Sequence, residues 1–286
     1  MLCPKSTNTP TTLAVPAFGT FLSSAYPAVL AMVMAMTNRR VAIVTGGGTG
    51  VGRAACTELA AEGWTIVAAG RTLKSLTATV ESVESAGGTA MAVVCDVSQP
   101  DSVDGLFRRV DDAWGRVDLL FNNAGTSAPP VPIEELSFED WNKVVGANLT
   151  GSFLCAQRAV SAMKRQQPSG GRIINNGSVS AYTPRPNSAP YTATKHAITG
   201  LTKSLALDGR GHGITCGQID IGNAATEMTV AISNGVPQAD GSLKGEATMD
   251  AQDVGRAVAY MAALPRDTNV LSMTIMASEM PFVGRG

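Results

Sequence analysis

Tyr191 and Lys195 are the two residues whose types and spacing most directly suggest chemistry. Four residues apart on a helix, their side chains lie on one face, a single turn from each other. A phenol is a weak acid, but a neighbouring ammonium group favours the phenolate, which lets a tyrosine exchange a proton with a substrate oxygen. The same spacing also fits a surface contact on an amphipathic helix, so the surrounding sequence must decide between the two interpretations.

A glycine-rich segment lies between an expected strand and an expected helix. Residues 41–45 form a short apolar run, typical of a strand buried on both faces, and a helical stretch ends near Ala61. Between them, backbone amides at the helix N-terminus can receive a pyrophosphate. A merely flexible turn is the alternative, but strand and helix patterns go on alternating further along the chain. We expect a cofactor to bind at Gly46, Thr49, Gly50, Val51 and Gly52.

The second expected strand, residues 64–69, is followed by Gly70 and Arg71. In a dinucleotide-binding fold an acidic residue near this position would bind the ribose 2′-hydroxyl. Here no carboxylate repels a 2′-phosphate, and the guanidinium is suited to receive one. The sequence therefore favours NADP(H) over NAD(H), although Arg71 could instead cap a solvated turn.

Further candidate residues follow later strands. The third strand, 89–95, ends at Asp96 and Val97, where an adenine edge could meet the carboxylate, and Ser98 is predicted to cap the next helix. The fourth strand, 117–121, leads into small residues that let a cofactor ring approach the backbone. We expect cofactor contacts there at Asn123, Ala124 and Gly125.

The second half of the chain supplies the other candidates. A long helix capped by Ser137 contains Asn148, and a fifth strand at 172–176 is followed by Ser178. A sixth strand is expected at 214–219, an irregular segment at 220–250, then a short helix and a last strand near 270–275. Alternating strands and helices predict an α/β, doubly wound parallel sheet of the Rossmann type, in which ligands bind at the carboxyl ends of the strands.

Taken in order, these motifs resemble the short-chain dehydrogenase/reductase family, in its single-domain branch. The residues that carry the resemblance are the segments 45–52 and 122–125, Asn148, Ser178 and the Tyr191–Lys195 pair. The resemblance implies NAD(P) binding and hydride exchange at a carbonyl or alcohol carbon, usually in homotetramers or homodimers. It implies that Tyr191 is the general acid/base and that Lys195 favours its phenolate and binds the nicotinamide ribose. Ser178 would hydrogen-bond the substrate oxygen, and Asn148 would position a proton-relay water.

Two segments depart from the family pattern. Where the family often has Pro-Gly after the sixth strand, this chain has Asp220 to Asn223 (Asp-Ile-Gly-Asn), and residues 276–286 lack a frequent Asp-Gly-Gly ending. Both segments are expected to border the substrate pocket or subunit contacts. Residues 224–250 mix apolar and polar types, which suggests a mobile lid over a partly apolar pocket.

The leading functional hypothesis is an NADP-dependent reductase or dehydrogenase of a small ketone or secondary alcohol, with 3-oxoacyl-carrier-protein reduction as one candidate. An isomerase or dehydratase on the same fold is an alternative. A non-catalytic NADP-sensing protein is another, although the complete Ser–Tyr–Lys–Asn set speaks against it.

Composition narrows the class of protein. The chain has 286 residues, 44% of them hydrophobic and 16% charged, and its net charge of −1 argues against a nucleic-acid partner. Five cysteines without a CxxC motif suggest reduced thiols in a cytoplasmic protein, and two histidines argue against a His-based metal site.

Residues 1–38 differ from the remainder, with one charge and an apolar run broken by proline, glycine and serine. A signal peptide, a membrane anchor and a disordered extension are the three interpretations, and the third is preferred. No membrane partner is therefore expected, and the dehydrogenase-like domain is expected to occupy residues 39–286.

Overall fold

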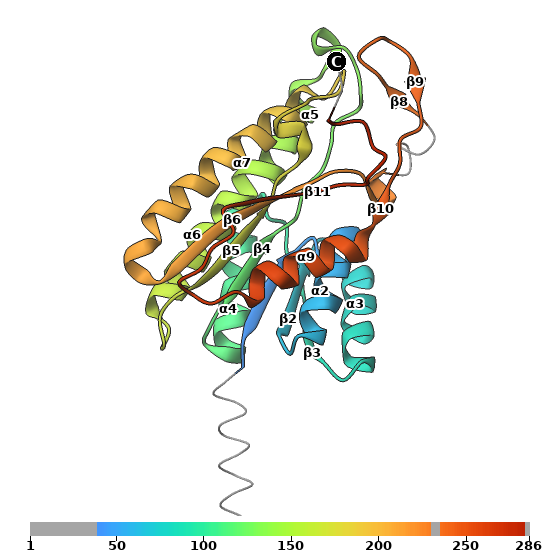
Figure 1. Cartoon of the computed structure of the whole chain (residues 1–286). Helices are drawn as coiled ribbons and strands as arrows, with labels where there is room; N and C mark the ends of the chain where they lie inside the picture. Colours follow the sequence, from blue (N-terminus) through green and yellow to red (C-terminus); the bar gives the residue numbers. More distant parts are fainter. Residues whose placement is uncertain (1–38, 230–234, 284–286) are drawn as a thin grey trace, which may run out of the picture. The chain divides into compact units, whose positions relative to one another are not determined.

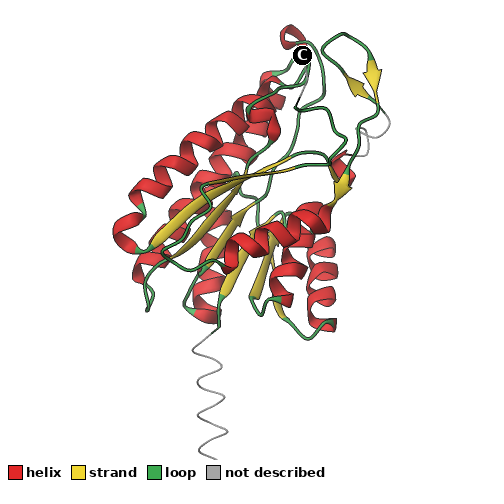
Figure 2. Ribbon diagram, viewed as in Figure 1, coloured by secondary structure: helices red, strands yellow, loops and turns green. Residues whose placement is uncertain are grey.

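Seven parallel strands form the central sheet of the compact unit Arg40–Gly286 (Figures 1 and 2). The computed structural model describes residues 39–229 and 235–283, so the extension predicted for 1–38 lies outside the described residues. The strands are β1 (Val41–Thr45), β2 (Thr65–Gly70), β3 (Thr89–Val94), β4 (Leu119–Asn122), β5 (Gly171–Asn176), β6 (Ile214–Ile221) and β11 (Ser272–Ile275). Their spatial order is β11-β6-β5-β4-β1-β2-β3, which confirms the predicted doubly wound parallel sheet. Chain order reverses between β1 and β4, and the loops there diverge to leave a crevice at the carboxyl ends.

Helices cover both faces of this sheet. They are α2 (Gly50–Ala61), α3 (Leu73–Ser85), α4 (Pro100–Trp114), α5 (Phe138–Val145), α6 (Gly151–Arg165), α7 (Ala189–Asp208) and α9 (Ala251–Ala263). One core cluster lies under α2, α3 and α9, and a second lies under α4, α6 and α7 (Figure 1). Because both faces are covered, every residue of β1 is buried, as its continuous apolar run predicts.

Short elements lie between the main helices and strands. They are the 3-10 turns η1 (Ile133–Glu135), η3 (Val179–Ala181), η4 (Arg210–His212) and η5 (Glu227–Thr229), the π-helical turn η2 (Gly146–Thr150), and the strands β7 (Ala224–Ala225), β8 (Val236–Pro237), β9 (Leu243–Lys244) and β10 (Met249–Asp250). β8 and β9 form a small hairpin, and β7 pairs with β10. Residues 220–250 therefore contain more structure than their composition indicates.

Two predicted helix caps have different outcomes. Ser137 caps α5 as expected, because its hydroxyl accepts a hydrogen bond from the backbone N–H of Asp140 at 3.0 Å. The prediction for Ser98 is wrong by one residue, since Gln99 is the residue before α4 and makes no side-chain cap. The Ser98 hydroxyl instead donates to the Asp96 carboxylate at 2.8 Å, so it is not available to the helix.

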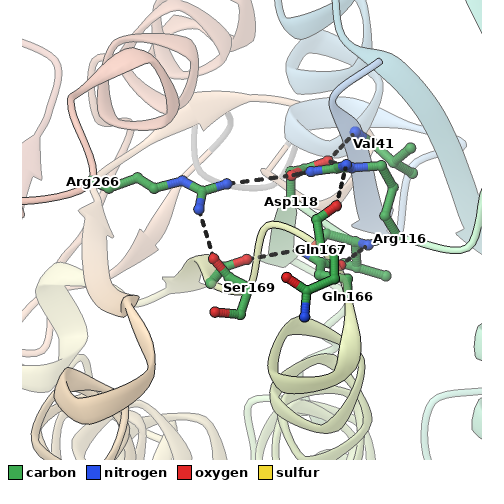
Figure 3. Close-up of polar contacts among 9 residues, drawn as sticks. Val41, Arg116, Asp118, Gln166, Gln167, Ser169 and Arg266 are labelled. Atoms are coloured by element: carbon green, nitrogen blue, oxygen red, sulfur yellow. Dashed lines mark hydrogen bonds and ion pairs between the residues drawn. The ribbon is translucent and has the colours of Figure 1, made fainter. Parts of the chain in front are cut away.

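A polar network joins the amino-terminal edge of the sheet (Figure 3). Asp118, just before β4, accepts from the backbone N–H of Val41 at 2.9 Å and from two guanidinium nitrogens of Arg116 at 2.8 and 2.7 Å. Arg266 lies 4.0 Å from the same carboxylate and donates to the carbonyl of Ser169. The carboxylate thus connects the first strand, the fourth strand and the loop after α9 on the side opposite the crevice.

Replacing Asp118 with alanine should lower the free energy of unfolding by about 3 kcal/mol. The substitution leaves a buried backbone N–H and a partly buried guanidinium without their acceptor. Urea unfolding of the two proteins measures the difference. Asp267→Ala, at an exposed residue in the neighbouring loop, is the control and should shift the midpoint very little. Equal midpoints for wild type and Asp118→Ala would contradict the prediction.

The four cysteines in the described part of the chain are free and buried, as predicted for reduced thiols, whereas Cys3 lies outside it. Burial raises the pKa of Cys56 to about 12, so this thiol stays protonated at neutral pH. Among the described residues, no helix has the length and apolarity needed to cross a membrane.

Candidate active site

Ser178, Tyr191 and Lys195 meet at the carboxyl ends of the strands. Ser178 follows β5 and caps η3, while Tyr191 and Lys195 lie in the first two turns of α7. The ammonium nitrogen of Lys195 is 5.4 Å from the centre of the Tyr191 ring, so the predicted shared helix face is present. Ser178 and Tyr191 both line a cavity of about 400 Å³, which we call the Ser178 cavity.

Lys195 is held in place by the end of β5. Its side chain is buried, with 5% of the residue exposed, and its ammonium donates to the backbone carbonyl of Asn176 at 2.7 Å. The side-chain oxygen of Asn176 is a second, longer acceptor at 3.4 Å. A buried ammonium needs such acceptors, and these two fix the cation beside Tyr191 rather than letting it extend into solvent.

Asn148 lies in the π-helical turn η2, an irregularity that is frequent at functional sites. Its amide accepts from the backbone N–H of Thr126 at 2.8 Å and donates to the Thr126 carbonyl at 3.0 Å and to the Thr194 hydroxyl at 3.2 Å. The side chain therefore links the segment after β4 to the helix that carries Tyr191. It is not part of the lining of the Ser178 cavity.

The glycine-rich loop has, at its tightest point, a backbone conformation that favours glycine. Gly46 has a φ of +67°. A Cβ at Gly52 would lie 2.1 Å from the Gly46 carbonyl oxygen. Thr49 makes no side-chain cap, and no other described side chain accepts from the first amides of α2. An open loop with unclaimed amides suits a pyrophosphate.

Two adjacent cavities run along this loop, and together we call them the glycine-loop groove. One of about 180 Å³ contains Tyr191 and Lys195 in its lining, and one of about 860 Å³ contains Arg71. All thirteen predicted cofactor residues line one or both: Gly46, Thr49, Gly50, Val51, Gly52, Arg71, Asp96, Val97, Asn123, Ala124, Gly125, Tyr191 and Lys195. The lining residues and the open loop fit an extended dinucleotide.

Thr45 and Asn123 hold the groove open where β1 and β4 diverge. The Thr45 hydroxyl accepts from the backbone N–H groups of Asn123 and Ala124 at 2.9 and 3.0 Å. The Asn123 amide donates to the Thr45 carbonyl at 2.9 Å and accepts from the amide of Asn176 at 2.9 Å. This chain of bonds ties the floor of the groove to the same residue that binds Lys195.

Sequence reasoning missed the role of Asp220, noting only that it departs from the family pattern. Its carboxylate is fully buried and accepts from the Ser178 backbone N–H at 3.1 Å, the Tyr182 hydroxyl at 3.0 Å, the Ser272 hydroxyl at 3.2 Å and the Gln218 amide. An acidic residue inside an otherwise buried strand is the one signal that could have identified it. Asp220 thereby fixes the backbone that presents Ser178.

Comparisons with known proteins agree with this geometry. The family model described as short chain dehydrogenase matches residues 40–236. A 3beta-hydroxysteroid dehydrogenase of Mediterraneibacter gnavus is 40% identical over 197 residues, covering 69% of this chain and 70% of that protein. A 3-oxoacyl-[acyl-carrier-protein] reductase of Synechocystis sp. is 37% identical over 197 residues, covering 68% and 78%. The crystal structure of an actinorhodin polyketide ketoreductase variant with NADPH has a TM-score of 0.76 and 27% identity, covering 84% and 96%.

The chain belongs to the short-chain dehydrogenase family, as the sequence motifs predicted. It is an NAD(P)-dependent oxidoreductase that acts on CH–OH or carbonyl groups.

Proposed function

We propose that the protein is an NADP(H)-preferring reductase or dehydrogenase of a small ketone or secondary alcohol, with Tyr191 as the general acid/base. The observation that carries this proposal is the position of Tyr191, which lines both the glycine-loop groove and the Ser178 cavity. A proton donor at that boundary can reach a substrate oxygen while the reacting carbon faces the groove.

The chain's own residues then have distinct tasks. When bound, the nicotinamide supplies or accepts the hydride. Tyr191 gives its proton to the carbonyl oxygen during reduction and takes it back during oxidation. Ser178 donates a hydrogen bond to the same oxygen, which stabilises negative charge there more in the transition state than in the ground state. Lys195 places its positive charge beside the Tyr191 ring and holds the ribose, and Asn148 aligns the helix of Tyr191 with the segment after β4.

The preference for NADP(H) rests on the end of β2. The groove is lined there by Gly70, Arg71, Thr72 and Ser75, none of which is acidic. Thr72 makes no side-chain cap to α3, so the first amides of this helix are additional donors for an anion. The Ser75 hydroxyl already donates to the Thr72 carbonyl at 2.9 Å, but a guanidinium, the Thr72 hydroxyl and a helix N-terminus still suit a 2′-phosphate better than a neutral 2′-hydroxyl.

Arg71→Ala should weaken NADPH binding by about 1–3 kcal/mol, because a charge-assisted hydrogen bond is lost, while NADH binding changes little. Fluorescence titration with both nucleotides measures the two dissociation constants. Lys74→Ala is the matched control, since Lys74 is exposed on α3 and does not line the groove. Equal binding of NADPH and NADH to the native protein would contradict the proposed preference.

The names of the relatives suggest a 3beta-hydroxysteroid and a 3-oxoacyl-[acyl-carrier-protein] as substrates to test. The partly apolar Ser178 cavity is consistent with a ketone or alcohol of modest size. An isomerase or dehydratase on this fold is a weaker hypothesis, because Tyr191 and Lys195 also line the groove where the nicotinamide would react. A pure NADP sensor would not need Ser178 beside Tyr191.

The remaining expectations are proposals of the same kind. We infer a single domain over 39–286 and a cytoplasmic homotetramer or homodimer. Exposed apolar side chains on α6, α7 and α9 (Phe153, Leu207 and Tyr260) support self-association.

A screen of ketones and secondary alcohols with each nucleotide, followed by nicotinamide absorbance, tests the function directly. We expect turnover of at least one ketone, faster with NADPH than with NADH. A protein that binds NADPH but turns over no carbonyl or alcohol would support the sensor hypothesis instead.

A further inference from the structure

The Ser178 cavity has one charged residue in its described lining, Arg185. Arg185 follows η3, and its neighbours in the lining are apolar or carry neutral hydroxyl and amide groups. A lone cation facing a cavity would normally indicate an anionic ligand. Whether it does so here depends on what the guanidinium already binds.

Arg185 is paired with Glu246, which lies shortly after the β8–β9 hairpin. The guanidinium Nη2 donates to the Glu246 carboxylate and to the side-chain oxygen of Asn223, the latter at 2.9 Å. The Glu246 side chain is only 2% exposed. Its carboxylate also accepts from the amides of Asn223 at 2.8 Å and Gln238 at 3.0 Å. The carboxylate is therefore firmly held beside Arg185.

Glu246 stays ionised at neutral pH. Burial raises its pKa, but the hydrogen bonds from Gln238, Asn223 and Arg185, together with the charge of Arg185, outweigh this and leave the pKa below its ordinary value. The charges of Arg185 and Glu246 thus cancel at the cavity wall. Among the described residues, the buried Nε–H of Arg185 has no acceptor, and an uncharged oxygen could bind it without placing a second negative charge beside Glu246.

We infer that the Arg185–Glu246 pair makes the Ser178 cavity electrically neutral and selects ketones and alcohols that carry no carboxylate. This inference rests on the proposed function and names its substrate class. A carboxylate entering the cavity would have to share one guanidinium with Glu246, which places two like charges on a single cation. No other cation in the described lining could compensate its lost hydration.

The test compares a ketone ester with the matching keto acid. Methyl levulinate and levulinate form a suitable pair. In both compounds the carboxyl group is remote from the ketone, so the ketone of the ester and the ketone of the acid have similar reactivity. For the native enzyme we expect kcat/KM for the ester to exceed that for the acid by at least roughly 100-fold, the scale of an uncompensated buried charge.

Glu246→Gln removes the negative charge while keeping the shape and a carbonyl acceptor for Arg185. The acid-to-ester ratio of kcat/KM should then rise at least about 10-fold, because Arg185 is released to bind the substrate carboxylate. Asp240→Asn is the matched control: it removes a carboxylate from an exposed part of the same hairpin and should leave the ratio unchanged. The double variant Arg185→Gln/Glu246→Gln is again neutral and should lose the gain.

Three outcomes would overturn the inference. They are equal use of acid and ester by the native enzyme, no rise in the ratio for folded Glu246→Gln, and a rise that persists in the double variant. Thermal unfolding and NADPH titration report whether each variant is folded. If Glu246→Gln does not fold, the native ratio still decides, because equal use of acid and ester by the native enzyme overturns the inference. If the native enzyme reduces neither the neutral keto ester nor the anionic keto acid, nor any ketone of the screen, the proposed function itself fails. That result is distinct from the three outcomes above.

Discussion

Replacing Tyr191 with phenylalanine should lower kcat by about 100-fold or more while leaving nucleotide affinity nearly unchanged. The substitution removes only the hydroxyl, so the ring keeps its position on α7 under the Lys195 ammonium. What is lost is the proton donor at the boundary of the two cavities, and losing a general acid/base typically lowers a rate by this factor. Steady-state kinetics with the best ketone from the screen, and NADPH titration, measure the two quantities.

A matched control tests whether the loss of a tyrosine hydroxyl lowers kcat only at position 191. Tyr260 is exposed on α9, so Tyr260→Phe removes the same hydroxyl away from the site and should leave kcat unchanged. If Tyr191→Phe instead turns over at a near-native rate, Tyr191 is an ordinary pocket residue. The proposed mechanism would then rest on fold resemblance alone, which is a weaker argument.

Gly52→Ala should reduce kcat/KM for the nucleotide roughly 100-fold. The new Cβ would lie 2.1 Å from the carbonyl oxygen of Gly46, and the amide of Asn123 is only 2.7 Å away. Backbone must move by about an ångström to relieve such a contact, and a displacement of this size in a binding loop has effects of this order. The variant should also unfold more easily, by about 1–3 kcal/mol, because the clash is with backbone.

Gly105→Ala is the comparison that isolates the clash from the general effect of a methyl group in a helix. Gly105 lies within α4, and a Cβ there would meet no atom within 4 Å. Alanine is the better helix former, so this variant should be more stable by about 0.5–1 kcal/mol and bind nucleotide normally. If Gly52→Ala has the native kcat/KM for the nucleotide, the loop can accommodate a Cβ at this position, and the prediction is wrong.

Local sequence patterns were enough to predict the framework and the glycine-loop groove. β1 coincides with the apolar run 41–45. A strand that is buried on both faces consists of consecutive apolar residues, so it can be predicted from its own sequence without knowledge of the neighbouring strands. The Tyr191–Lys195 spacing gave the shared face of α7 directly. In both cases the information lies within a few adjacent residues.

The contacts that sequence reasoning missed join residues far apart in the chain. Arg185 and Glu246 are separated by 61 positions, and Asp220 and Ser178 by 42. No periodicity links such pairs, and each residue alone looks like an ordinary polar residue on a loop or at a strand end. The misplaced cap at Ser98 has a different, local cause, since an acceptor two residues earlier binds its hydroxyl.

The donors around Asp220 have a consequence for protein engineering. Exchanging the segment that begins at Asp220, near the end of β6, is an obvious way to transfer specificity between relatives, because this segment forms much of the Ser178 cavity. In this protein the graft would also have to respect Tyr182 and Ser272, which lie outside the segment yet donate to the Asp220 carboxylate. A donor segment with an apolar residue at this position would leave those hydroxyls and the Ser178 amide without their acceptor. The smallest transferable unit therefore combines the segment that begins at Asp220 with Tyr182, directly after η3, and Ser272 in β11.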